Sequence, residues 1–376
     1  GSQHLQNHAN EILAAIEAHP DEDTKFDQSK NRSLAKAISV ALQAYVPENI
    51  IARVLELGEQ GYTHMDIETY DTSWEGDAYS TVSGQNSNNS VRVSNDFMQA
   101  VLDESDWNLF WRTELDDASA ENRDPAPCKS IPANDLWDKI SKAAWSCADP
   151  GLQYDTTINE WHTCSPDGPI NGSNPCSEYM FLDDTACNLA SLNLVKFYDD
   201  ETTKFDTEKY SHAIRLWTVA LEISVLMAQF PSEAIAQRSY DYRTLGLGYA
   251  NIGSLLMRMG IPYDDNRATS ICGALTSILG GVSYAASAEM SSVQGPFPRY
   301  ENNKDNMLRV MRNHRRAAYN APSEEYEGLT VTPRGIDSNY CPEYLLSAAQ
   351  NCWDKVVTDG EKFGFRNAQA TVIAPT

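Results

Sequence analysis

Five residues near the middle of the chain, Asn174-Pro175-Cys176-Ser177-Glu178, combine an amide, a thiol and a carboxylate at two-residue spacing. In an extended segment, side chains two residues apart point the same way and stand roughly 6.5–7 Å from each other, so Asn174, Cys176 and Glu178 are expected to share one face. Pro175 fixes its own φ and favours extended geometry at Asn174, which stiffens the segment. The pattern therefore predicts three functional groups directed at one ligand.

On spacing alone, an ordinary buried cysteine in a polar turn explains these residues at least as well. A zinc set of His162, Cys164, Cys176 and Cys187 is another alternative, but the spacings match no familiar zinc framework, so we predict no metal site. His162 and Cys164 are either lining residues of a substrate cleft or structural residues. A lone histidine in a loop favours the structural interpretation.

The chain is strongly acidic, with 53 acidic and 29 basic residues and a net charge of −24. Such a field repels a polyanion, so we expect no nucleic-acid partner, and the phosphates of a nucleotide ligand must be held locally. The apolar run 211–230 is interrupted by polar residues, the first residues lack a secretory signal, and the eight cysteines contain no Cys-x-x-Cys pair. We therefore expect a cytoplasmic globular protein without a membrane span or a disulfide scaffold.

Hydrophobic periodicity divides the chain into a helix-rich segment, 1–85, and an α/β unit, 86–376. Residues 90–93 alternate like a strand that passes into a helix near residue 96, with Ser94 or Asn95 as its cap. The irregular run 159–178 is long enough to indicate a functional loop. We expect further helices at 34–45, 48–59, 134–147, 208–229, 249–259, 269–292, 303–318 and 342–359, and further strands at 109–113, 153–158 and 370–373. The helix at 208–229 is apolar nearly all round, which predicts that it is buried.

Residues 174–194, NPCSEYMFLDDTACNLASLNL, resemble the active-site finger loop and following strand of class II ribonucleotide reductases, which depend on adenosylcobalamin (vitamin B12). Five further blocks resemble the same family in the same order: 83–98, 153–164, 243–253, 313–321 and 366–376. The resemblance covers essentially the whole chain. It implies part of the ten-stranded α/β barrel of the ribonucleotide reductase/glycyl-radical type, two parallel five-stranded halves that enclose Cys176 on a central finger loop.

By this resemblance, Cys176 is the thiyl-radical residue, and adenosylcobalamin supplies the radical when its cobalt–carbon bond breaks. Cys176 then takes the 3′-hydrogen of a ribonucleotide, a step that suits a thiol because its S–H bond is close in strength to an activated ribose C–H bond. Glu178 resembles the general base for the 3′-hydroxyl, and Asn174 the residue that steadies the sugar hydroxyls. Cys187 falls at the position of one reducing cysteine; a small core cysteine beginning a strand is the alternative.

The resemblance also implies substrate contacts from Pro175 and Ser177 and, at the other end of the unit, from Pro375 and Thr376. In the family, a Gly-containing turn that cradles the substrate phosphates follows Ala374-Pro375-Thr376. The second reducing cysteine and the effector-reading loops come earlier than any residue of this chain, and further barrel strands and tail cysteines come later. We therefore expect a piece truncated at both ends and inactive alone.

The implied activity is reduction of ribonucleotides, with diphosphates preferred, to 2′-deoxyribonucleotides. The implied partners are the ribonucleotide, a deoxynucleotide or ATP effector, a thioredoxin- or glutaredoxin-type reductant, and the missing N- and C-terminal segments of the same enzyme. A class I large subunit with a separate radical-generating partner is the first alternative, although the sequence Pro-Cys-Ser-Glu and the long segment 1–85 favour class II. A non-catalytic interaction remnant is the second, although the joint presence of Asn174, Cys176, Glu178 and Cys187 favours catalysis.

Overall fold

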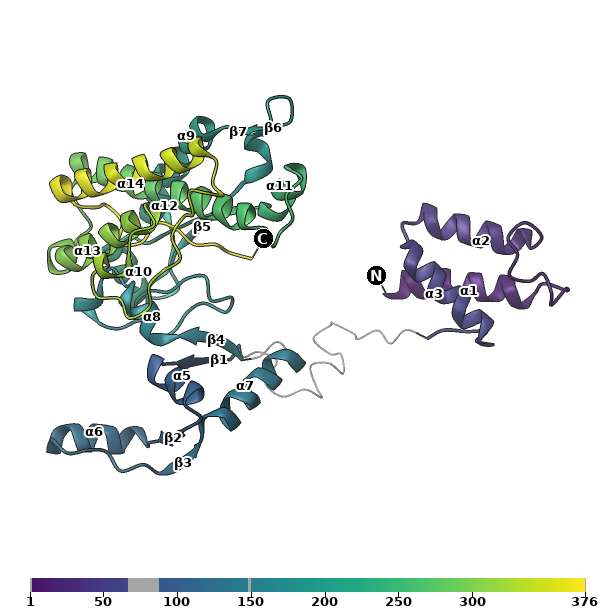
Figure 1. The fold of residues 1–376 in the computed structure, drawn as a ribbon, viewed down its shortest axis with the longest axis horizontal. Coiled ribbons are helices and arrows are strands. Elements are labelled where there is room, and N and C mark those ends of the chain that lie inside the picture. Colours follow the sequence, from purple (N-terminus) through teal and green to yellow (C-terminus); the bar gives the residue numbers. More distant parts are fainter. Residues whose placement is uncertain (1, 67–87, 148–149, 376) are drawn as a thin grey trace. The chain divides into compact units, whose positions relative to one another are not determined.

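The computed structural model describes residues 2–66, 88–147 and 150–375 (Figure 1). Contacts between residues divide the chain into two units, residues 1–87 and residues 88–376. The predicted fold class is confirmed in its coarse form, because parallel strand pairs alternate with helices in the second unit.

The first unit is a three-helix cluster of α1 (Ser2–Glu17), α2 (Arg32–Gln43) and α3 (Glu48–Glu59). Their apolar faces form one core, which includes Ile12, Leu34 and Val54. The predicted helix over 48–59 is confirmed, and that over 34–45 lies two residues earlier. Asn31 fixes the start of α2, because its Oδ1 accepts from Leu34 N at 3.0 Å while its Nδ2 donates to two carbonyl oxygens.

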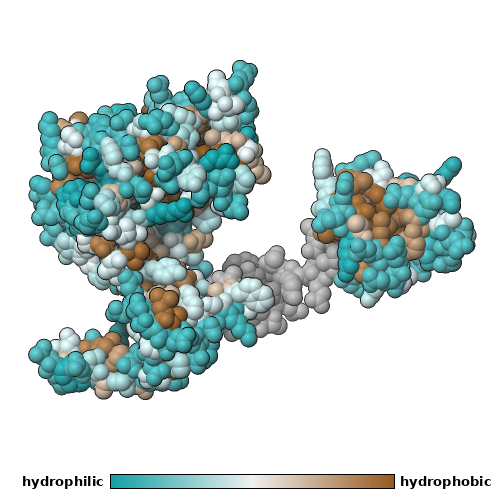
Figure 2. Space-filling model, viewed as in Figure 1, coloured by the Kyte–Doolittle hydropathy of each residue, from teal (hydrophilic) through white to brown (hydrophobic). Residues whose placement is uncertain are grey.

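On the visible surface of this first unit, hydrophobic residues gather in one patch and hydrophilic residues surround it (Figure 2). Its exposed large apolar side chains are Val40, Leu42, Tyr45 and Tyr62.

Three parallel segments form the centre of the second unit. Strand β5 (Asn188–Asn193) pairs with β8 (Leu245–Ala250), and Thr371 joins the other edge of β8 through a bridge to Leu247. The predicted strand at 370–373 is thus present only as this bridge. Gly248 allows the close approach, because a Cβ there would come within 2.3 Å of the Val372 carbonyl oxygen.

The other strands also lie in pairs. Strand β1 (Ser90–Val93) runs parallel to β4 (Gly151–Tyr154), whereas β2 (Asp106–Leu109) is antiparallel to β3 (Lys129–Pro132). A short antiparallel pair joins β6 (Tyr198–Asp199) to β7 (Lys204–Phe205). Each sheet in the described part of the chain has two strands, so the ten-stranded barrel implied by the resemblance is not closed there.

Four long helices cover the central strands: α9 (Thr207–Met227), α12 (Asn266–Gln294), α13 (Tyr300–Ala318) and α14 (Glu343–Phe363). Helix α12 packs on α14 and α9. Among the described helices, it alone is long and apolar enough to cross a membrane, and 72% of its most apolar window is buried inside the protein. These are the properties of a core helix.

The shorter helices complete the unit. They are α5 (Asn95–Leu102), α6 (Arg112–Glu121), α7 (Ala133–Cys147), α8 (Asp155–Glu160), α10 (Glu233–Tyr242), α11 (Ile252–Arg258) and the 3₁₀ turns η1 (Ser165–Asp167), η2 (Leu194–Phe197) and η3 (Ser323–Glu325). The predicted strand at 90–93 is confirmed, and Ser94 caps the helix that follows, since its Oγ accepts from Phe97 N at 3.2 Å.

Two predicted strands are wrong in their bounds. The strand expected at 153–158 ends at Tyr154, because its partner β1 ends opposite it at Val93, and Asp155 then begins α8 with an acidic first turn. The strand expected at 109–113 likewise ends at Leu109, opposite the first residue of β3.

The prediction that the helix over 208–229 is buried all round is also wrong. One face of α9 is buried, with Ile214, Leu221 and Val225 in the core. The opposite face exposes Leu216, Trp217, Ile223, Leu226 and Met227, because α12 and the central strands cover α9 from one side.

Candidate active site

The segment Asn174–Ser177 forms a tight turn, so the predicted extended geometry is wrong. Ser177 N donates to the Asn174 carbonyl oxygen at 3.0 Å, and an antiparallel bridge joins Ser173 to Met180 on either side of the turn. Proline suits the second position of such a turn, and Ser177 takes a left-handed φ of 63°. Asn174, Cys176 and Glu178 therefore do not lie along one face of a strand.

Cys176 lies at the tip of this turn, next to Pro175, and both side chains are exposed. The resemblance implied a thiol enclosed in a barrel. In the described residues, the paired strands do not close around the turn, and this is the physical reason for the exposure.

Polar contacts from β4 hold the turn in place. Gln153, which is buried, donates from Nε2 to Ser173 Oγ at 2.7 Å and to Ser177 Oγ at 3.2 Å. Asn174 Oδ1 accepts from Tyr179 N at 3.0 Å, so the oxygen of this amide is used inside the loop. Its nitrogen has no hydrogen-bond partner among residues 2–66, 88–147 and 150–375.

Tyr179 ties the turn to the amino ends of the central strands. Its side chain is buried, and its hydroxyl lies 2.9 Å from Oγ1 of both Thr185 and Thr244. Thr185 precedes β5 and Thr244 precedes β8. Burial raises the pKa of Tyr179, so its hydroxyl stays neutral and serves as an anchor.

Glu178 and Cys187 form the buried end of the site. Glu178 Oε2 is buried and has no hydrogen-bond partner among the described residues. Cys187 lies directly before β5, where burial, and then the negative charge of Glu178, raise the pKa of its thiol to about 11. This thiol is protonated at neutral pH and lies within electrostatic reach of the Glu178 carboxylate.

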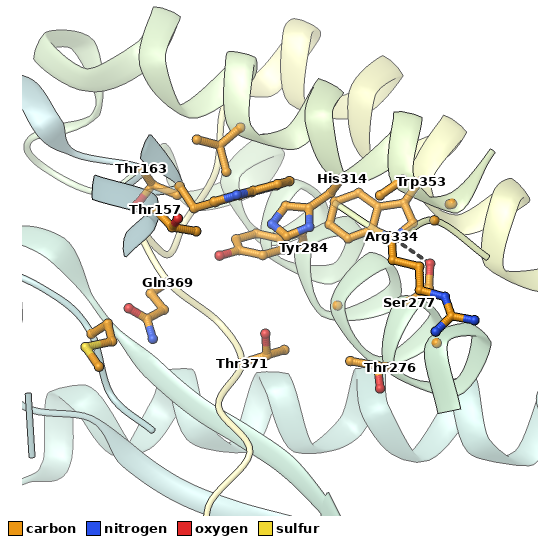
Figure 3. A pocket seen from close by; sticks show the side chains of 18 of the residues that line it. Thr157, Thr163, Thr276, Ser277, Tyr284, His314, Arg334, Trp353, Gln369 and Thr371 are labelled. Carbon is orange, nitrogen blue, oxygen red and sulfur yellow. Dashed lines mark hydrogen bonds between the residues drawn. The ribbon is translucent and has the colours of Figure 1, made fainter. Parts of the chain in front are cut away.

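Glu178 also borders a cavity of about 760 Å³ between the segment 157–163, the strand residues 369–371 and helices α12, α13 and α14 (Figure 3). His162 lines it too, with only 2% of its surface exposed, and burial lowers the pKa of its imidazole to about 4. Its ring also meets Phe181 edge to face at 5.3 Å. His162 is thus both packed in the core and part of the cavity wall, whereas Cys164 is fully buried outside the cavity lining.

The remaining predicted residues lie elsewhere. Pro375 is exposed at the end of the described chain, and Thr376 lies outside the described residues. No three His, Cys, Asp or Glu side chains gather as metal ligands within the part of the chain that the structure describes.

Sequence reasoning missed the residues that position the site. Gln153 and Tyr179 hold the turn, and Trp161, His314 and Trp353 form one wall of the cavity. Gln153, Trp161, Tyr179 and His314 belong to blocks that carry the family resemblance, which was the available signal; Trp353 had none.

Comparisons with known proteins show the family of this chain. Residues 60–376 match the family model described as ribonucleotide reductase, barrel domain. The whole chain is 54% identical to a vitamin B12-dependent ribonucleotide reductase of Agrobacterium fabrum and 52% identical to one of Bradyrhizobium diazoefficiens, and it spans 29% of the length of each. A vitamin B12-dependent ribonucleoside-diphosphate reductase of Thermoplasma acidophilum is 31% identical over 66% of this chain, which spans 30% of that relative. The chain therefore belongs to the ribonucleotide reductase family.

Proposed function

We propose that this chain carries the radical cysteine of an adenosylcobalamin-dependent reductase that converts ribonucleoside diphosphates to 2′-deoxyribonucleoside diphosphates. One observation carries the proposal: a single turn joins the exposed thiol of Cys176 to the buried, unpartnered carboxylate oxygen of Glu178 and its neighbour Cys187. The names of the most similar relatives support the dependence on vitamin B12, and the name of the Thermoplasma relative supports the diphosphate.

The turn fits a bulky cofactor that has to reach a thiol. Pro175 and Cys176 are exposed at the tip, while the base of the turn is fixed by Gln153 and Tyr179. When bound, adenosylcobalamin supplies a radical that takes the hydrogen atom of a thiol. Pro175 and Cys176 are the residues placed to meet it.

Three side chains of this chain then act on the ribose, each in a different role. The sulfur radical of Cys176 takes the 3′-hydrogen and returns a hydrogen atom at the end of the cycle. The free nitrogen of Asn174 donates to a sugar hydroxyl. Glu178 takes the proton of the 3′-hydroxyl, which supplies the hydrogen-bond donor that its buried Oε2 lacks.

Cys187 is suited to the reducing step because its thiol keeps its proton at neutral pH. Replacement of the 2′-hydroxyl by hydrogen, with loss of water, requires two protons and two electrons. Cys187 and a second cysteine supply the two electrons and become a disulfide, which a thioredoxin- or glutaredoxin-type protein reduces again. Since this chain spans 29% of the first two relatives, we propose that it works within a longer enzyme, with an effector site elsewhere, and is inactive alone.

The test is a chimaera in which residues 1–376 replace the matching stretch of the Agrobacterium relative. With adenosylcobalamin, a nucleoside diphosphate and a dithiol, the chimaera should turn over, and Cys176→Ser should abolish turnover. Cys128→Ser is the matched control, because Cys128 is also an exposed free cysteine. An unchanged rate in the Cys176→Ser chimaera would end the catalytic assignment and favour a non-catalytic remnant.

The same chimaera separates the finer alternatives. Competition between CDP and CTP should favour CDP, and a preference for CTP would replace the diphosphate by the triphosphate. Turnover without adenosylcobalamin, dependent on a separate radical-generating protein, would favour the class I alternative.

A further inference from the structure

The cavity beside Glu178 has an aromatic wall that the proposed reaction does not use. His314 lies between two tryptophans, with its ring 4.7 Å from Trp161 and stacked on Trp353 at 4.9 Å and 14°. Tyr284 continues the wall at 6.2 Å from Trp353 (Figure 3). Burial lowers the pKa of His314 to about 4, so this wall is neutral. Trp353 is 3% and Tyr284 6% exposed, so Trp161 and His314 offer most of the ring surface that a ligand can reach. Such a surface favours a flat aromatic ligand.

The same cavity is lined by an arginine, Arg334, that has no acidic partner among the described residues. The other arginines near the end of α13 are paired: Arg312 and Arg316 with Glu327, and Arg315 with Asp354. Arg334 is an exposed residue that lines the cavity beside Ser277 and Trp353, and it has no ion pair or hydrogen bond among the described residues (Figure 3). In a chain of net charge −24, an unpaired guanidinium in a cavity wall favours an anion.

The loop that carries Arg334 is tightly held. Ile336 N donates to the Ala317 carbonyl oxygen at 3.2 Å. Gly335 packs so closely that a Cβ there would come within 2.5 Å of Asn320 Oδ1 and 2.9 Å of the same Ala317 oxygen. The backbone around Arg334 is therefore fixed against the end of α13 before any ligand arrives.

A third feature is an orphaned polar atom in the wall. His162, 2% exposed, lines the cavity, and its Nε2 is buried without a hydrogen-bond partner among the described residues. Buried polar groups normally have a partner, so this nitrogen indicates a ligand that carries its own hydrogen-bonding group. A volume of about 760 Å³ falls within the range of small-molecule sites, roughly 300–1,000 Å³.

We propose that this cavity is a second nucleotide position, which binds a mononucleotide with its base against Trp161 and His314 and its phosphate at Arg334. His162 Nε2 meets a polar edge of the base or sugar. Glu178 borders this cavity, but the contacts inferred for the ligand come from other side chains, so the inference does not rest on the chemistry proposed for Cys176. The binding test needs neither cofactor nor reductant, so it can succeed where the proposed function fails, and the reverse.

The test is titration of the chain, residues 1–376, with AMP, adenosine and ribose 5-phosphate, followed by calorimetry and by tryptophan fluorescence. AMP should bind and quench fluorescence, adenosine should bind about tenfold more weakly because it lacks the charge-assisted contacts to Arg334, and ribose 5-phosphate should bind least. Binding of ribose 5-phosphate as tight as that of AMP would overturn the stacking, and so would absence of AMP binding.

Two variants locate the ligand. Arg334→Gln should reduce AMP binding to the level of adenosine and leave adenosine binding unchanged, while Arg112→Gln, an exposed arginine outside the cavity, should change neither. Trp161→Leu should weaken AMP and adenosine alike, by about tenfold for loss of one stacking partner. Arg334 is exposed, so the fold should tolerate Arg334→Gln. If this variant binds AMP as tightly as the unaltered chain does, the proposal is overturned, whatever the result for Trp161→Leu.

Discussion

The turn around Cys176 and the segment that follows it differ sharply in how they are held. At the tip, Pro175 and Cys176 are exposed, and the backbone is fixed by hydrogen bonds from short polar side chains. Three and five residues after Cys176, Tyr179 and Phe181 are buried in the main core. The tip, Pro175 and Cys176, therefore exposes a thiol at little cost to the stability of the fold. The stem, residues 179–181, is anchored by the buried side chains of Tyr179 and Phe181 and holds the tip in position.

This contrast lets changes in activity be separated from changes in stability. Substitutions at exposed positions usually alter stability by no more than about 0.5 kcal/mol, whereas loss of a partner for a buried polar group costs about 1–3 kcal/mol. A tip variant should lose chemistry and keep its fold. A stem variant should lose stability first.

The largest effect is expected at Glu178, where the two regions meet. Glu178→Gln keeps the shape but removes the proposed base, so turnover of the chimaera should fall by roughly 10²- to 10⁴-fold. The midpoint of thermal unfolding should not fall, because the lost charge belongs to a carboxylate whose Oε2 has no partner among the described residues. Steady-state kinetics and calorimetry check both parts; near-normal turnover would remove Glu178 from the reaction.

Next in size is Tyr179→Phe, which tests the stem. The change removes a hydroxyl that lies 2.9 Å from both Thr185 and Thr244, so the free energy of unfolding should drop by about 1–3 kcal/mol. Tyr240→Phe is the control, since Tyr240 is exposed. Equal stability of the two variants in denaturant titrations would contradict the anchoring role.

Gln153→Leu should have a smaller and more local effect. The buried amide donates to Ser173 and Ser177 at the base of the turn, so its loss should free the turn, with a global cost of about 1 kcal/mol. Amide hydrogen exchange should accelerate at Ser177, whose N–H closes the turn, and not in β8. Exchange that accelerates equally in both places would mean general unfolding instead.

The smallest effect concerns the pH dependence of the two thiols of the site. Thiolate is the reactive form, and a pKa of about 11 leaves Cys187 protonated at pH 8. Alkylation followed by mass spectrometry should label exposed Cys176 first, and the rate at Cys187 should keep rising, about tenfold per pH unit, until the pH approaches 11. A Cys187 rate that levels off near pH 9 would contradict the raised pKa.

Local signals predicted part of this structure. The helix at 48–59 and the strand at 90–93 were predicted to the residue because their periodicity is contained in the segment itself. The turn was predicted as extended because the left-handed φ of Ser177 depends on Gln153 and on the Ser173–Met180 bridge, contacts that spacing cannot reveal. The β-branched run Thr156-Thr157-Ile158 similarly resembled a strand, although its partner ends earlier.

The candidate site shows the same limit. Cys176, Glu178 and Cys187 were predicted as site residues from one contiguous block that resembles a family. The cavity wall joins Trp161, His314, Arg334 and Trp353, which come from four segments and meet only when the helices pack. Their roles depend on tertiary contacts. Trp161 and His314 lie in blocks that carry the family resemblance, whereas Arg334 and Trp353 lie in none.

The most direct test of the central claim is hydrogen transfer at the Cys176 thiol. Thiol hydrogens exchange with water, so adenosylcobalamin tritiated at its 5′ carbon should release tritium to solvent when the chimaera passes hydrogen through Cys176. The account predicts release from the unaltered chimaera and from Glu178→Gln, which retains the thiol, and none from Cys176→Ser. Release at the same rate from Cys176→Ser would contradict it.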